Sequence, residues 1–334
     1  MTSPNPWLQA AKIAGGVAIL TVVAVVLFSL SAVGSGLAKV PPPARPTAAG
    51  DVSVSPPDAG EPAASAQEAG QGASQPQPPP GFAPALLAVC FLMAVAVTPV
   101  VVRSRWRGWR AAGALALLIW GQMTVLSQAE TVVYLPQVSR EFLEKIVVFG
   151  TMFSVTFALA AVQILGRARR RSEAEAAPLQ PTGWSRWAWR VAAVAVLHVA
   201  VYYVAGYYLA WKNPVLRAYY GGTDPGSFLL QLRSIAVGTP WMYPYQLAQG
   251  VLWALLVVLL VRMVRGPHLA VAVIAAVFFG IVGPCQLLLP NSIMPDAVRL
   301  THLVETVVSR VVFAVIAVWL LRPGNASPGT ERSA

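Results

Sequence analysis

Residues 82–110 read FAPALLAVCFLMAVAVTPVVVRSRWRGWR, an apolar run that ends in a cluster of arginines. The part from 82 to 102 carries no charged side chain. A helix of about 20 apolar residues is long enough to cross the hydrocarbon core of a bilayer. Four arginines follow between 103 and 110, and such residues are enriched in cytoplasmic loops. The stretch therefore predicts a transmembrane helix whose C-terminal end faces the cytoplasm.

Seven further stretches have the same apolar character, at about 13–33, 111–134, 146–166, 188–210, 245–264, 269–289 and 302–321. Of the 334 residues, 56% are hydrophobic and 11% are charged, whereas a soluble domain carries about 25% charged residues. A helix satisfies its own backbone hydrogen bonds in lipid. We therefore expect an all-α, polytopic transmembrane helical bundle with about eight spans.

The distribution of lysine and arginine predicts how this bundle is oriented. Placing the loop at 103–110 in the cytoplasm puts 15 Lys and Arg inside and 8 outside, and leaves Arg310 within a span. This arrangement is N-in/C-in and fits the positive-inside rule. We therefore expect a multi-pass protein of a bacterial inner (plasma) membrane. The net charge of +11 follows from the same loops, so we expect membrane lipid rather than nucleic acid as the partner.

Four regions are expected along the chain. Residues 1–38 form an N-terminal transmembrane anchor, which we interpret as uncleaved, although cleavage before Lys39 would leave a seven-span form. Residues 39–81 have eleven prolines and no aromatic side chain, which is typical of a disordered linker, here on the periplasmic side. Residues 82–322 form a seven-helix membrane bundle with an outer loop at 211–244, and residues 323–334 form a cytoplasmic tail.

The outer loop is expected to contain a short helix at 227–236, because apolar residues recur there at helical spacing. Asp224 and Pro225 are a favourable N-cap and first helical position. The tyrosines of the loop are typical of an interfacial aromatic belt. Four other polar residues of the loop are not explained by a belt, and we expect them to close over a site: Asn213, Arg217, Asp224 and Arg233.

Polar side chains within the spans gather in their outer halves. A charged or amide side chain in the membrane is costly unless it has a partner, so each one is a functional hypothesis. The candidate catalytic residues are Glu130, His302 and Glu305. The candidate ligand-binding residues are Gln128, Gln246, Gln249, Gln286, Arg217, Asp224 and Arg310.

The last span carries the densest polar pattern, HLVETVVSR at 302–310. His302, Glu305 and Ser309 fall on one helix face, which is expected to point into the bundle. Arg310 lies about 12 Å deeper than His302 along a helix, and its partner is expected from another segment, either Glu130 or His198. Such a pair could also serve only to lock helix packing. For His198 itself we expect a hydrogen-bonded core position.

Three functions fit this pattern. The first is a periplasm-facing intramembrane pocket that binds or transports a small polar ligand or a lipid headgroup. The second is a membrane-embedded enzyme acting on a lipid or lipid-linked substrate at the outer leaflet, and the third is a non-catalytic subunit or sensor of a membrane complex. The chain has no GxxxxGK[ST], HExxH or GxSxG motif. No metal site or cofactor is assigned, and the oligomeric state is left open.

Overall fold

The structure is a computed structural model that describes residues 6–37, 40, 78–136, 138–166, 184–291 and 293–322. Throughout these ranges the chain forms helices, turns and loops, with one isolated β-bridge between Ser104 and Val264. Most of the linker expected at 39–81, and all of the tail expected at 323–334, lie outside the described residues.

Within the described ranges, eight helical segments are long and apolar enough to cross a membrane, which confirms the expected multi-pass helical architecture. The uninterrupted helices are α1 (Pro6–Gly34), α2 (Phe82–Val102), α5 (Arg140–Leu165), α9 (Met242–Met263) and α11 (Asp296–Leu321). Three spans change helix type along their length. One consists of α3 (Gly108–Trp120), η2 (Gly121–Leu126) and α4 (Ser127–Tyr134). Another consists of α6 (Trp184–Ala205) and η4 (Gly206–Trp211), and the third of α10 (His268–Ile281) and η5 (Pro284–Leu288).

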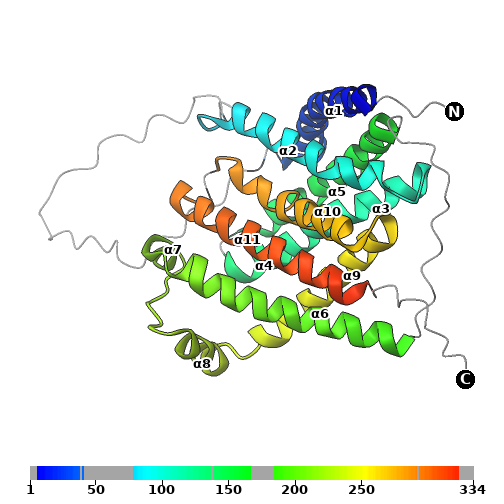
Figure 1. Ribbon diagram of the computed structural model, residues 1–334. Helices are drawn as coiled ribbons and strands as arrows, with labels where there is room; N and C mark the ends of the chain where they lie inside the picture. Colours follow the sequence, from blue (N-terminus) through cyan, green and yellow to red (C-terminus); the bar gives the residue numbers. More distant parts are fainter. Residues whose placement is uncertain are drawn as a thin grey trace, which may run out of the picture.

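The helices pack in the order α1, α2, α10, α11 and α6 across the molecule, as Figure 1 shows from top to bottom. Helix α9 packs on α6, and α5 contacts both α1 and α3. The first span is part of this packing, because Leu20 and Ala24 are fully buried and the Phe28 ring lies 4.9 Å from that of Phe149 in α5. Helix α1 is therefore integrated into the bundle.

Each of the three interrupted spans contains one segment that departs from regular α-helical geometry. The segments η2 and η4 are π-helical turns, and η5 is a 3-10 turn that starts at Pro284. Single π-helical turns are rare and occur often at functional sites. Residues of all three segments line the cavity described below, so the irregular backbone and the candidate site coincide.

The outer segment between α6 and α9 contains α7 (Pro214–Tyr219) and α8 (Phe228–Gly238). The helix expected at 227–236 is thus present, but its predicted start is wrong. Ser227 is the N-cap, and its hydroxyl accepts a hydrogen bond from the Leu230 amide at 3.3 Å. Asp224 instead accepts a hydrogen bond from the Gly226 amide at 2.9 Å. Gly226 has a φ of 74°, which is incompatible with a right-handed helix running through this position.

Candidate functional site

A cavity of about 940 Å³ lies between α4, α6, α11 and the outer segment that carries α7 and α8. Ligand sites in proteins commonly have volumes of about 300–1,000 Å³. Its lining brings together the three candidate catalytic residues and Arg310, which come from α4 and α11. The other polar or aromatic side chains of the wall include Gln122, Ser127, Tyr134, His198, Tyr202, Tyr220, Trp253, Gln286 and Ser309.

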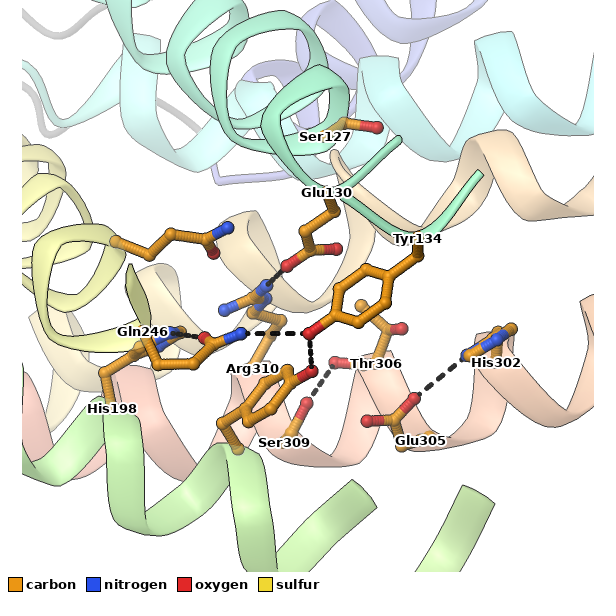
Figure 2. A network of polar contacts seen from close by, with 12 residues as sticks. Ser127, Glu130, Tyr134, His198, Gln246, His302, Glu305, Thr306, Ser309 and Arg310 are labelled. Atoms are coloured by element: carbon orange, nitrogen blue, oxygen red, sulfur yellow. Dashed lines mark hydrogen bonds and ion pairs between the residues drawn. The ribbon is translucent and has the colours of Figure 1, made fainter. Parts of the chain in front are cut away.

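His302 connects two parts of this wall. Its Nδ1 lies 3.1 Å from Oε2 of Glu305, one turn further along α11, as Figure 2 shows. Its Nε2 lies 2.9 Å from the hydroxyl of Tyr220. The two contacts form a continuous chain from the Tyr220 hydroxyl through the imidazole to the carboxylate. A histidine held between a hydroxyl and a carboxylate is suited to moving a proton between them.

The position of Tyr220 depends on the packing of α7 against the start of α11. Leu216 and Val298 are fully buried in a small apolar cluster at this contact, with Tyr220 packed beside them. The Asn213 side-chain amide donates a hydrogen bond to the Thr301 hydroxyl at 2.7 Å, which fixes the start of α7 to α11. This local packing directs the Tyr220 hydroxyl to His302.

Arg310 is held by two groups from other helices. Its Nη2 lies 3.8 Å from Oε1 of Glu130, and its guanidinium carbon lies 3.8 Å from the centre of the Trp253 ring. The Arg310 side chain is 13% exposed and that of Glu130 is 35% exposed. A guanidinium removed from water is stabilised by an opposite charge and by an aromatic face. Of the two partners expected for Arg310, Glu130 makes the ion pair.

His198 belongs to a hydrogen-bonded network of imidazole, amide and hydroxyl groups. It is 2% exposed, and its Nε2 lies 3.3 Å from Oε1 of Gln246. The Gln246 amide in turn donates to the Tyr134 hydroxyl at 3.3 Å, which contacts the Tyr202 hydroxyl. Figure 2 shows that this network joins α4, α6 and α9. His198 is therefore the hydrogen-bonded core histidine that we expected, although its ring also reaches the cavity wall.

The remaining candidate ligand-binding residues separate into two groups. Gln286 lines the cavity and donates a hydrogen bond to the Ser127 hydroxyl at 3.3 Å. Gln246 contacts two lining residues, His198 and Tyr134. Gln246 is itself not part of the lining, and neither are Gln128, Gln249, Arg217 and Asp224.

Three of these non-lining residues have identifiable local partners. Gln249 donates a hydrogen bond to the Tyr245 hydroxyl. Arg217 donates to the Trp211 carbonyl at 2.7 Å and lies 3.4 Å from Asp224. The Gly226 amide, and then Arg217, hold the pKa of Asp224 below its ordinary value. Arg217 and Asp224 therefore shape the outer segment instead of facing the cavity.

Several wall residues were not identified from the sequence. Gln122 is 3% exposed, and neither its side-chain oxygen nor its nitrogen has a hydrogen-bond partner within the described part of the chain. An amide inside an apolar stretch was the available signal for Gln122. Tyr220 was grouped with the aromatic belt because its partner, His302, is 82 residues away in the sequence.

Comparison of the chain with protein-family models, curated proteins and solved structures finds no match. The cavity itself is therefore the basis on which function can be inferred. Its wall offers carboxylates as acceptors, a guanidinium and amides as donors, and aromatic rings as apolar surface. This combination suits a ligand with both a polar and an apolar part.

Proposed function

We propose that this protein resides in a bacterial inner membrane and binds or transports a small polar ligand or a lipid headgroup in an intramembrane cavity open to the periplasm. The observation that carries the proposal is the convergence of Glu130, His302, Glu305 and Arg310 on one cavity of about 940 Å³. Ionisable side chains inside a membrane bundle are functional candidates by default, because hydrocarbon tolerates them only beside partners or water.

The orientation is supported by the positions of the basic residues. With 15 Lys and Arg on one side and 8 on the other, the richer side is assigned to the cytoplasm. Helix α11 then begins in the periplasm at Asp296 and ends in the cytoplasm at Leu321. His302 and Glu305 lie in the first three turns of α11, so we assign the cavity to the outer half of the bilayer.

Helix packing alone explains this site less well. Protein interiors are close-packed, with few voids larger than a water molecule, and a large cavity with polar walls is expected to hold water or a ligand. The side-chain oxygen and nitrogen of Gln122, which have no partner among the described residues, add an acceptor and a donor for such a molecule. A purely structural ion pair between Glu130 and Arg310 requires neither feature.

Substituted-cysteine labelling tests whether the cavity opens to the outside. The native Cys90 and Cys285 are buried and are first replaced by alanine. Ser309→Cys then places a thiol in the cavity wall, whereas Val308→Cys is the matched control on the outer surface of the same helix. A charged, membrane-impermeant methanethiosulfonate added to intact cells should label the first variant and not the second. Labelling of Ser309→Cys from the cytoplasmic side alone would contradict the proposed opening.

Native mass spectrometry tests whether the cavity holds a molecule. The full chain is extracted from its own membrane in a mild detergent, and bound molecules are compared between wild type and two variants. Ser309→Trp fills the cavity, while Val308→Trp adds the same bulk outside it. A molecule retained by wild type and by Val308→Trp, but lost from Ser309→Trp, is the expected result. Equal retention by all three would place the bound molecule elsewhere.

A membrane-embedded enzyme acting on a lipid or lipid-linked substrate is the second candidate, and one observation favours it. The chain Tyr220–His302–Glu305 has the order of hydroxyl, base and orienting carboxylate that activates hydroxyl groups in enzymes. Incubation of the protein with lipids extracted from its own membrane should then yield a product that Tyr220→Phe does not form. Binding of unaltered lipid by both proteins, without any product, would favour the binding function instead.

A further inference from the structure

Three arginines from separate segments lie at the end of the bundle opposite the cavity. Arg105 lies between α2 and α3, Arg265 lies between α9 and α10, and Arg322 follows α11. The first two segments are held together by backbone hydrogen bonds, from the Arg105 amide to the Met263 carbonyl at 2.7 Å and from the Arg265 amide to the Arg103 carbonyl at 2.8 Å. This pairing puts Arg105 opposite Met263 and Arg265 opposite Arg103, so Arg105 and Arg265 are fixed diagonally across two paired backbone segments.

The charges of this arginine cluster (Arg105, Arg265 and Arg322) affect one another. Burial, and then the charge of Arg265, lower the pKa of Arg105. Burial, and then the charge of Arg105, lower the pKa of Arg322. Arg322 is 20 residues beyond His302 on α11, which corresponds to about 30 Å along a helix. The cluster is therefore distinct from the cavity with its carboxylates.

Two members of the cluster have unsatisfied hydrogen-bond donors. Nε of Arg265 and Nη1 of Arg322 are buried and have no hydrogen-bond partner within the described residues. None of the ion pairs formed by described residues includes either arginine. Positive charges that are close together and partly buried are stabilised by an anion. Guanidinium groups bind phosphate oxygens through paired N–H donors.

An apolar groove of about 270 Å³ begins at Trp106, the residue after Arg105. Its walls also include Trp109, Arg110, Ala114 and Leu117. The Trp106 backbone is fixed by two hydrogen bonds with the Ser104 hydroxyl, at 3.0 and 3.1 Å. A groove lined by tryptophan and aliphatic groups beside a basic cluster matches a molecule with a phosphate and a hydrocarbon chain.

We propose that this surface binds an anionic phospholipid, with the phosphate at the arginine cluster and an acyl chain along the groove at Trp106. Basic pockets between transmembrane helices recognise anionic headgroups in this way. Free phosphate shares the headgroup chemistry, but it leaves the groove unused. The proposal is independent of the cavity and of the orientation of the bundle.

Thermal unfolding of the full chain, delipidated in detergent, tests the phospholipid site. Dioleoylphosphatidylglycerol should raise the Tm of wild type by several degrees, because a ligand that binds only the folded state stabilises it. Dioleoylphosphatidylcholine, which has no net charge, should raise it much less. The double variant R265Q/R322Q should lose most of the phosphatidylglycerol effect. The control R107Q/R262Q removes the same charge from exposed positions at the same end and should keep the effect.

A second comparison separates the lipid from a free anion. Gly113 lies in the groove wall, and a Cβ at this position meets nothing within 4 Å, so Gly113→Leu places an aliphatic side chain in the groove. This variant should lower the affinity for phosphatidylglycerol. A Tm increase that inorganic phosphate reproduces and that Gly113→Leu leaves unchanged would overturn the phospholipid site in favour of an anion site.

The charge control and a direct count of bound lipid complete the test. Equal loss in the control R107Q/R262Q would show a nonspecific charge effect and would also overturn the proposal. If R265Q/R322Q fails to fold, native mass spectrometry of wild type in an equal mixture of the two lipids replaces it. Preferential retention of phosphatidylglycerol is then expected, and equal retention of both lipids would overturn the site.

Discussion

Gly250→Ala tests the closest helix contact behind the candidate site. Helices α6 and α9 approach each other at Gly250, where an added Cβ would lie 2.6 Å from the Ala195 carbonyl oxygen and 2.9 Å from its Cα. Ordinary contacts begin at 3.4 Å, so the helices must separate by about 0.8 Å to accept one methyl group. Both opposing atoms belong to the backbone and cannot rotate away. Glycine at such crossings is typical of membrane helix interfaces.

The expected energy follows from two opposing effects. Overpacking a close-packed interface costs about 1–3 kcal/mol, whereas replacing glycine by alanine inside a helix gains at most about 1 kcal/mol. Gly250→Ala should therefore destabilise the fold by about 1–2 kcal/mol. Gly15→Ala in α1 is the matched control, because a Cβ there meets nothing within 4 Å. Only the helix-propensity gain remains for Gly15→Ala, so this variant should be neutral or slightly stabilised.

Reversible unfolding in mixed detergent micelles, followed by circular dichroism, measures the difference between these two variants. The same shift of α9 should weaken the contact of His198 with Gln246, which lies one turn from Gly250. A changed chemical shift of the His198 ring, relative to wild type, would report that displacement. Equal stability of Gly250→Ala and Gly15→Ala would refute the reasoning, because it would mean that the helices are not in close contact at this point.

Three further predictions address the charged and capping residues. Glu130→Gln should lower the free energy of unfolding by about 2 kcal/mol, because it leaves the partly buried Arg310 without its carboxylate partner. The double variant with Arg310→Met should regain part of this stability. A double variant as unstable as Glu130→Gln would contradict the pairing. Ser227→Ala should cost α8 about 1 kcal/mol through loss of its N-cap, seen as faster hydrogen exchange confined to that helix; unchanged exchange would contradict the cap. The hydrogen bond from Gly226 lowers the pKa of Asp224 below its ordinary 3.8. The ionised Asp224 therefore stabilises the folded state above pH 3.8, and this stabilisation is lost as the pH falls through the folded pKa. An NMR titration midpoint of Asp224 at or above 3.8 would contradict this.

Each spanning helix was predictable because its information is local. A helix in lipid satisfies its own backbone hydrogen bonds, so length and apolar composition identify it without knowledge of its neighbours. All eight apolar stretches correspond to helical segments for this reason. The one-face pattern of His302 and Glu305 was equally local, and their contact at 3.1 Å lies within a single turn.

Fine backbone conformation was less accessible from the sequence. Asp224 and Pro225 fit the composition of a helix start, yet the helix begins after Ser227, because Gly226 takes a positive φ. The π-helical turns at η2 and η4 also carry no simple sequence signature. Each depends on how a span adjusts to the helices packed around it.

Partners across helices were fixed only by the tertiary structure. The sequence predicted Glu130, His302 and Glu305 in the outer halves of their spans, but depth does not specify rotation about a helix axis or the choice of neighbour. The position of α4 across the cavity from α11 selects Glu130 for Arg310, and packing of α7 against α11 brings Tyr220 to His302. Composition therefore settles which segments can enter a membrane, because burial in lipid depends on each segment alone. The site depends on contacts between residues far apart in the chain, which only the packed bundle specifies.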